Sequence, residues 1–132
     1  MRLQSLAIGL AAVAALLAAG CAVDPMEKLS RDTDAQDLMT RTRAVVALAN
    51  LKDDRAVDAL VDVLQGDEEL CDQAGVALVK KGRLVPEKKK PNPVVEAVAR
   101  VAANTHLLEA TRARACWVLG EIGDREAVPA LK

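Results

Sequence analysis

The chain has no Phe and no Tyr among its 132 residues, and Trp117 is its one aromatic residue. A hydrophobic core without rings has to be built from Ala, Val and Leu, whose small side chains let helices approach closely. We expect Trp117 to lie in that core, at the place that Val46 takes in an earlier helix. The alternative is a partner-binding anchor, a role in which Trp is common.

Histidine and serine are also scarce. His106 is the one histidine, and the three cysteines form no CxxC pair, so the sequence offers no credible metal site. Ser5 and Ser30 lie in N-terminal segments, and no GxSxG, HExxH or phosphate-binding Gly-rich loop is present. We therefore predict no enzyme, no cofactor and no metal, and we expect His106 at the surface.

Charge of one sign is not in excess. The chain has 18 Lys and Arg against 19 Asp and Glu, a formal net charge of −1. Proteins that bind nucleic acid usually carry a clustered basic excess. The composition therefore predicts no nucleic-acid partner.

The N-terminal segment has the three parts of an export signal. Arg2 is followed by an uncharged Ala- and Leu-rich run, and then by small residues directly before Cys21. We predict a signal peptide over residues 1–20. Residues 3–23 are also long enough to span a bilayer, so an uncleaved anchor and ordinary secretory cleavage remain alternatives.

This segment resembles a bacterial lipoprotein signal peptide, in which the Cys is lipidated and becomes the new N-terminus. The resemblance implies lipid attachment, palmitate included, at Cys21. Because Ala22 follows and not Asp, it also implies delivery to the outer membrane, with the protein facing the periplasm. The lipid chains would hold the protein at the membrane, at about 0.8 kcal/mol per buried methylene.

Two cysteines remain, Cys71 and Cys116, and both lie among apolar residues of predicted helices. Buried free thiols, which behave as small hydrophobic groups, are one interpretation. Because an exported compartment permits oxidation, a disulfide between them stays open, as does a reactive or metal-binding role.

The chain repeats itself at a spacing of 71 residues. The stretch 40–61, "TRTRAVVALANLKDDRAVDALV", aligns without gaps on 111–132, "TRARACWVLGEIGDREAVPALK", with ten identical positions of 22. A weaker copy lies between them, in "QAGVALVKKG" and "VVEAVARV", with the insertion "RLVPEKKKPNP" at its turn. This spacing is typical of repeat proteins built from helix pairs.

The repeat defines the domain organisation. We predict a tether over residues 21–33 and an all-α repeat domain over 34–132, a short α-solenoid of about three helix pairs. The repeats cover about 34–65, 67–104 and 105–132, the last one incomplete. Thr33 with Gln36 is predicted to open the first helix as a capping box, Asp53 to cap the second, and Gly66 to end it.

The third copy, "RARACWVLGEIGDREAVPAL", resembles the HEAT-like repeat first recognised in phycobilisome lyases, and the resemblance extends over about residues 35–132. It implies an α-solenoid with an extended concave surface. It also implies that the repeated arginines (Arg41 with Arg112, Arg43 with Arg114) pair with turn acids such as Asp53 or Asp124.

Two sets of charged residues are candidates for binding. Asp58 and Asp62 share one helix face and align with Glu96 and Arg100, which predicts a partner-contact surface on the concave side, unless this is only a solvated face. The lysines of the insertion could contact anionic lipid or an acidic partner, or form an ordinary solvated loop. The strongest candidates there are Lys88, Lys89 and Lys90.

The predicted function is a membrane-anchored scaffold for protein–protein interaction in the cell envelope, with an unknown envelope protein as partner. A bilin lyase or lyase subunit, and a purely structural subunit of an envelope complex, are the alternatives. The apolar residues of 127–131 begin a face that the sequence does not finish. This predicts self-association or missing repeats at that edge, and a frayed last helix if the chain is alone.

Overall fold

The computed structural model describes residues 23–123. Within this range all regular structure is helical and no strand is present. The elements are α2 (Pro25–Asp32), α3 (Leu38–Asn50), α4 (Arg55–Gly66), α5 (Cys71–Arg83), the 3-10 helix η1 (Glu87–Lys89), α6 (Pro93–Ala103) and α7 (Glu109–Ile122).

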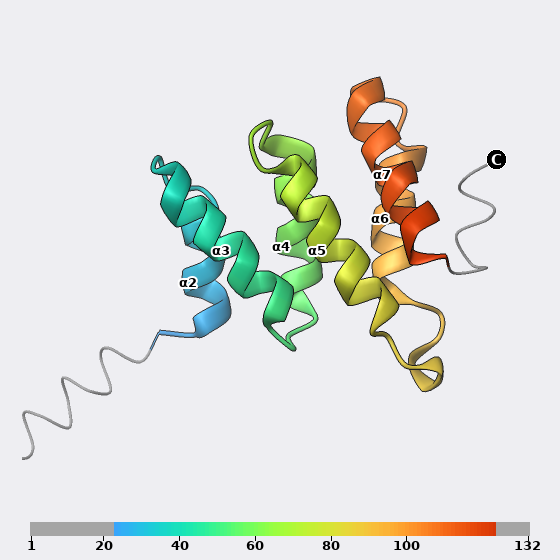
Figure 1. Cartoon of the computed structure of the whole chain (residues 1–132), viewed down its shortest axis with the longest axis horizontal. Helices are drawn as coiled ribbons and strands as arrows, with labels where there is room; N and C mark the ends of the chain where they lie inside the picture. The colour runs from blue at the N-terminus through green and yellow to red at the C-terminus, as the bar shows by residue number, and fades with distance from the viewer. Residues whose placement is uncertain (1–22, 124–132) are drawn as a thin grey trace, which may run out of the picture.

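The helices form two layers (Figure 1). One layer consists of α3, α5 and α7, and the other of α2, α4 and α6. Each helix packs against its neighbours in sequence and against the next helix of its own layer. The stacking of helix pairs side by side confirms the predicted α-solenoid.

The core lies between the two layers and consists of Ala, Val and Leu, as the composition predicts. On α4, Val57, Leu60, Val61 and Leu64 are buried at helical spacing, whereas the acidic residues between them are exposed. Complete burial of a leucine contributes about 1.5–3 kcal/mol relative to exposure. The largest fully buried side chains elsewhere include Leu48, Leu70, Leu78, Leu119 and Val98.

The segment that we expected to be a tether contains a helix. α2 packs against α3 and α4, and its Met26 is 5% exposed. The Asp24 side chain accepts a hydrogen bond from the Met26 amide and starts the helix directly before a proline. α2 therefore covers the side of α4 that faces away from α6, in the position of an additional second-layer helix.

The start of α3 also differs from the prediction. Asp37, and not Thr33, is the N-cap: its carboxylate accepts hydrogen bonds from the amide and the hydroxyl of Thr40. The Thr33 hydroxyl instead donates to the Ser30 carbonyl at the end of α2. Because α2 occupies residues up to Asp32, α3 has to begin later. The predicted end of α4 at Gly66 is confirmed.

The insertion between α5 and α6 is anchored by Asn92, which is completely buried. Its side-chain amide donates to the Gly82 carbonyl, and its side-chain oxygen accepts from the amides of Val94 and Val95. Asn92 therefore joins the end of α5 to the start of α6. The loop before it contains the 3-10 helix η1.

The expectation that Trp117 is a core residue is wrong. Its side chain is 48% exposed, because the position it shares with Val46 lies on the outer side of the α3/α5/α7 layer. Cys71 is buried and Cys116 is half-buried, and both thiols are free. His106 is exposed, as expected.

The predicted incomplete last helix, residues 124–132, lies outside the described residues. None of the helices within residues 23–123 is long and apolar enough to cross a membrane.

Candidate functional site

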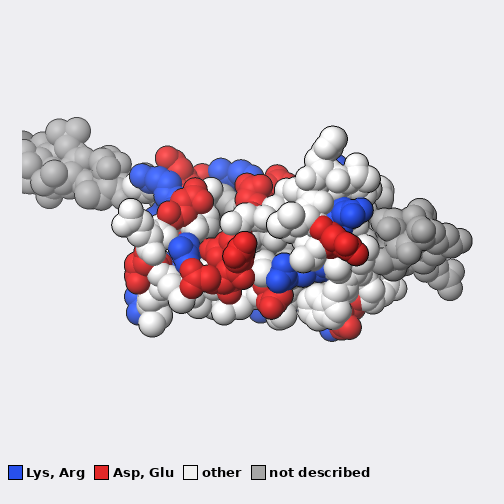
Figure 2. Space-filling model, turned by 90° about the horizontal axis from the view of Figure 1, so that it is seen from above, with Lys and Arg blue, Asp and Glu red and all other residues white. Residues whose placement is uncertain are grey.

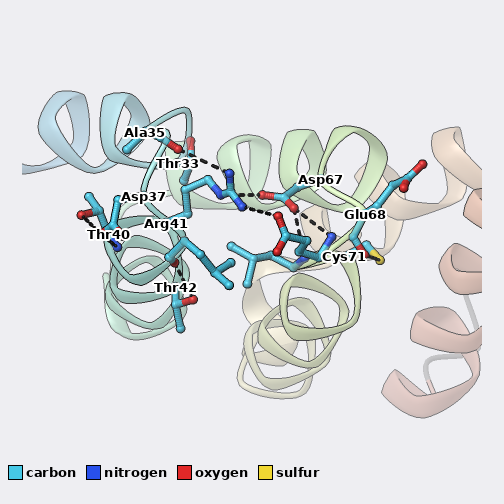
Figure 3. Close-up of polar contacts among 12 residues, drawn as sticks. Thr33, Ala35, Asp37, Thr40, Arg41, Thr42, Asp67, Glu68 and Cys71 are labelled. Carbon is cyan, nitrogen blue, oxygen red and sulfur yellow. Dashed lines mark hydrogen bonds and ion pairs between the residues drawn. The ribbon is translucent and has the colours of Figure 1, made fainter.

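Arg41 joins the first repeat to the second (Figure 3). Its guanidinium lies 3.2 Å from an Asp67 carboxylate oxygen and donates to Glu69 over 2.7 Å. The expected pairing with Asp53 is wrong, because Asp53 lies at the opposite end of α3 and binds Arg55. Arg41 and Asp67 are 17% and 16% exposed, so this contact is largely shielded from solvent.

The other repeated arginines behave differently from one another. Arg114 donates to Asp72 over 3.0 Å and so joins α7 to α5. Arg112 aligns with Arg41, and its Nε, like that of Arg41, is buried and has no hydrogen-bond partner among residues 23–123. Arg43 is exposed. Two of the four arginines therefore connect neighbouring repeats, as the resemblance implied, but through other acids.

Basic residues make the equivalent connections at the other end of the helices. Lys81 donates to the Leu51 carbonyl after α3, and Arg83 donates twice to the Glu121 carbonyl on α7. Carbonyl groups at a helix C-terminus lack partners within the helix and favour cations. Burial, with the neighbouring Lys80 charge, lowers the pKa of Lys81.

This arrangement separates charge along the helix axes. Figure 2 shows the end at which α3, α5 and α7 begin, where acidic side chains gather. The acids of the α4–α5 connection, Asp67, Glu68 and Glu69, belong to this end. They suit the positive N-terminal ends of the helices, as the lysines suit the opposite ends.

A groove between α4 and α6 holds three of the four residues predicted to contact a partner. Asp58 and Asp62 line it from α4, and Arg100 lines it from α6. The groove has a volume of about 320 Å³. It is also lined by Val61, Gln65, Ala97, Val101, Asn104 and Leu107.

The charges of this α4/α6 groove are not engaged within the fold. The side chains of Asp58, Asp62 and Arg100 form no hydrogen bond or ion pair with any other residue of the described range. Glu96, the fourth predicted residue, is exposed on α6 but does not line the groove. The structure therefore brings three of these residues together around an apolar floor and leaves the fourth outside.

A second groove lies on the other side of Asp58 and Asp62, between α2 and α4, with a volume of about 390 Å³. Its lining includes Met26, Glu27 and Arg31 of α2. The two acids therefore form a ridge with a groove on each side. The sequence did not predict this second groove, because it did not predict α2.

The other predicted residues have less defined surroundings. Lys88 and Lys89 are exposed in η1, and Lys90 follows it. Lys89 lines a groove of about 400 Å³ together with Lys80 and Lys81, which belong to the same basic cluster in the sequence, and with Lys52, which the sequence did not single out. The lysine pair that ends α5 was the available signal for that groove. Cys21 lies outside the described residues.

No group of three or more His, Cys, Asp or Glu side chains suited to a metal ion occurs within residues 23–123. Several acids in this range instead pair with arginines. Arg55 donates to Asp53 and Asp24, and these hydrogen bonds lower the pKa of both carboxyl groups and raise that of Arg55. The charged side chains that the fold does not pair are therefore of particular interest.

The family model for the PBS lyase HEAT-like repeat matches residues 40–66 and 111–132. The first match covers most of α3 and all of α4, the helix pair that carries Arg41 and the acidic ridge. A comparison with curated proteins found none that matches this sequence. The chain therefore carries HEAT-like repeats, in agreement with its two-layer helical stack.

Proposed function

We propose that this HEAT-like repeat protein is a membrane-anchored scaffold that binds another cell-envelope protein along its α2/α4/α6 face. The observation that carries the proposal is the α4/α6 groove, where Asp58, Asp62 and Arg100 surround an apolar floor without being paired. Charged groups that form no contacts within a fold are free to contact a partner. Two grooves that share one acidic ridge give this face a shape that an elongated partner segment can follow.

The groove defines the chemistry of the partner. Its floor contains Val61, Ala97 and Val101, which suit small apolar side chains. Asp58 and Asp62 suit Lys or Arg, and Arg100 suits a carboxylate on the α6 side. An amphipathic partner segment with basic residues next to small apolar ones fits these requirements. Such charges mainly determine which partner binds and how fast it associates.

Reversal of the acidic ridge tests the proposal. The double substitution Asp58→Lys with Asp62→Lys places repulsive charge where a basic partner would bind, and we expect it to abolish partner recovery from detergent extracts of whole membranes. A matched control, Glu87→Lys with Glu109→Lys, changes the net charge equally at exposed positions outside the two grooves. If the ridge variant recovers the same partner in the same amount as the wild type, the proposed binding face is wrong.

The anchor is a separate part of the proposal and rests on the small residues before Cys21. Mass spectrometry of the mature N-terminus should find a lipidated Cys21, and Cys21→Ala should block processing or release the domain. If the Cys21→Ala variant stays in the membrane at unchanged mobility, an uncleaved helix anchors the protein. Fractionation of inner and outer membranes then tests the proposed outer-membrane location.

A second candidate function follows from the matching family model, whose description contains the word lyase. In that case the protein, or a complex that contains it, would attach a bilin to an acceptor protein. The purified protein should then transfer bilin in the presence of an acceptor. Absence of transfer, together with loss of partner binding in the ridge variant, would favour the scaffold.

A further inference from the structure

The face formed by α3, α5 and α7, opposite the proposed binding face, carries an exposed apolar stripe. Val46, Val76 and Trp117 occupy the same position in three successive repeats and are 55%, 59% and 48% exposed. Valine and tryptophan at such exposure are unusual for a helix face that only meets solvent. Because α3, α5 and α7 lie side by side in one layer (Figure 1), these equivalent positions of the three helices are neighbours across the layer.

A groove of about 280 Å³ runs between Val76 and Trp117, and its floor contains Leu64. Gly75 also lines it and lies next to the indole: an added Cβ would be at ordinary contact distance, 3.6 Å, from the Trp117 ring. The indole therefore lies along α5 and keeps nearly half of its surface exposed. This apolar surface is available to a partner.

Two opposite charges on α5 lie at equal distances before and after Val76. Asp72 and Lys80 lie four residues before and four residues after Val76, so all three side chains share one helix face at a spacing of about 6 Å. Asp72 is 84% exposed although it accepts a hydrogen bond from Arg114. Lys80 is also exposed and uses one of its three donors on Asn50.

We propose that two copies of the chain associate through this face, related by a two-fold axis that runs along the stripe. Such an axis reverses the direction of the helices, so that α5 pairs with its own copy in antiparallel orientation. Val76 then meets Val76 of the second copy, and the two Trp117 rings come together. Asp72 of each copy lies opposite Lys80 of the other, which forms two ion pairs.

Charge complementarity favours a second copy over another occupant. A two-fold contact is self-complementary: the same patch has to supply both partners of every pair. The order acid, apolar, base on α5 meets this requirement when the helix pairs with itself in antiparallel orientation. A parallel arrangement would place Asp72 opposite Asp72 and Lys80 opposite Lys80, and the repulsion would disfavour it.

A charge swap tests this association in the full-length chain, with sedimentation in detergent as the readout. The wild type should sediment at twice the mass of a single processed chain. Asp72→Lys alone and Lys80→Asp alone each create two like-charge contacts, and each should raise the dimer dissociation constant by about tenfold or more. The double variant Asp72→Lys with Lys80→Asp restores opposite charges and should restore the dimer.

The rescue separates the dimer from an effect on folding. Asp72→Lys also breaks the Arg114 ion pair within the chain, but Lys80→Asp lies two helical turns away and cannot replace it. Gln73→Lys, at an exposed neighbouring position, serves as a control that should leave the dimer intact. Circular dichroism checks that every variant is helical.

A wild-type chain that sediments as a monomer, or a double variant that stays as weak as the single ones, would overturn the proposal. The proposal would also be overturned if the α3/α5/α7 face bound a different protein and not a second copy of the chain. None of these results depends on the α4/α6 groove, because the two faces lie on opposite layers.

Discussion

A single buried amide, Asn92, determines how the insertion joins the repeat stack. Its side chain is completely buried and forms hydrogen bonds with both the last turn of α5 and the first turn of α6. Asn92→Ala removes the cap of α6 and leaves the Gly82 carbonyl without this donor. We expect the free energy of unfolding to fall by about 2–4 kcal/mol, measured by urea denaturation.

Asn50→Ala is the matched control, because Asn50 is exposed at the end of α3. Its loss should change the free energy of unfolding by no more than about 0.5 kcal/mol. Equal destabilisation by the two substitutions would contradict the role assigned to Asn92.

The cap of α3 gives a prediction for acidic pH. Hydrogen bonds from the Thr40 hydroxyl and amide hold the pKa of Asp37 below its ordinary value of 3.8. A depressed pKa in the folded state means that the contribution of Asp37 is complete above pH 3.8 and is lost as the pH falls through the folded value. Stability should therefore decline more gently on acidification in Asp37→Asn, which caps without titrating.

Denaturation midpoints measured from neutral pH to below the ordinary pKa of Asp37 check this prediction. Asp34→Asn, a change three residues before the helix cap, is the control. If the wild type and Asp37→Asn lose stability in parallel over the whole range, the cap does not act through its charge.

At the scale of the helices, the approach of α5 to α7 depends on Gly82. A Cβ added there would lie 2.5 and 2.8 Å from two carbon atoms of Ile122, closer than atoms can pack. An added methyl in a filled contact costs about 1–3 kcal/mol. Gly82→Ala should therefore destabilise the protein, even though alanine is the better helix former.

Gly120 is the control for this contact, because nothing lies within 4 Å of its added Cβ on α7. Gly120→Ala should raise the free energy of unfolding by up to about 1 kcal/mol, through helix propensity alone. Relative to the wild type, the midpoint temperature of thermal unfolding should fall in Gly82→Ala and rise in Gly120→Ala. A higher midpoint in Gly82→Ala would contradict the packing described.

The contact of Arg41 with Asp67 and Glu69 is the clearest connection between the first two repeats. Because Arg41 and Asp67 are largely shielded, Arg41→Ala should destabilise the protein by about 1–2 kcal/mol, more than an exposed ion pair would. Arg43→Ala, at the exposed neighbouring arginine, should have little effect. Chemical denaturation of both variants compares them, and similar losses would show that the contact with α4–α5 does not matter.

The helices of the repeats could be predicted because the same pattern of apolar and turn residues recurs along the sequence. The burial pattern of α4 follows directly from its periodicity, with Val57 and Leu64 inside and Asp58 outside. α2 was missed because its sequence "PMEKLSRD" has few apolar residues, and Met26 alone carries most of its burial. Its presence in turn moved the cap of α3 from Thr33 to Asp37.

The pairing of side chains between repeats could not be predicted from sequence spacing. Arg41 and Glu69 are 28 residues apart and meet only because α3 and α5 lie side by side. The exposure of Trp117 was missed for a related reason: size suggested a core residue, whereas the equivalent Val46 and Val76 show which side of the helix faces out. The candidate groove was largely predictable, since Asp58, Asp62 and Arg100 lie on aligned helices.

At the scale of the whole molecule, the two layers present different chemistry. The α2/α4/α6 face carries two unpaired acids between two grooves, and the α3/α5/α7 face carries an apolar stripe flanked by an acid and a base. One face would therefore recognise a different protein, and the other a second copy. A dimer of this kind would present two partner-binding faces on opposite sides.

Site-specific photo-cross-linking in intact membranes tests the central claim most directly. A photoreactive residue at Gln65, in the α4/α6 groove, should give an adduct with one other envelope protein, and Asp58→Lys with Asp62→Lys should abolish it. The same residue at Gln73, on the opposite layer, should not give this adduct. Absence of any adduct from Gln65, or the same adduct in equal yield from both positions, would contradict the account.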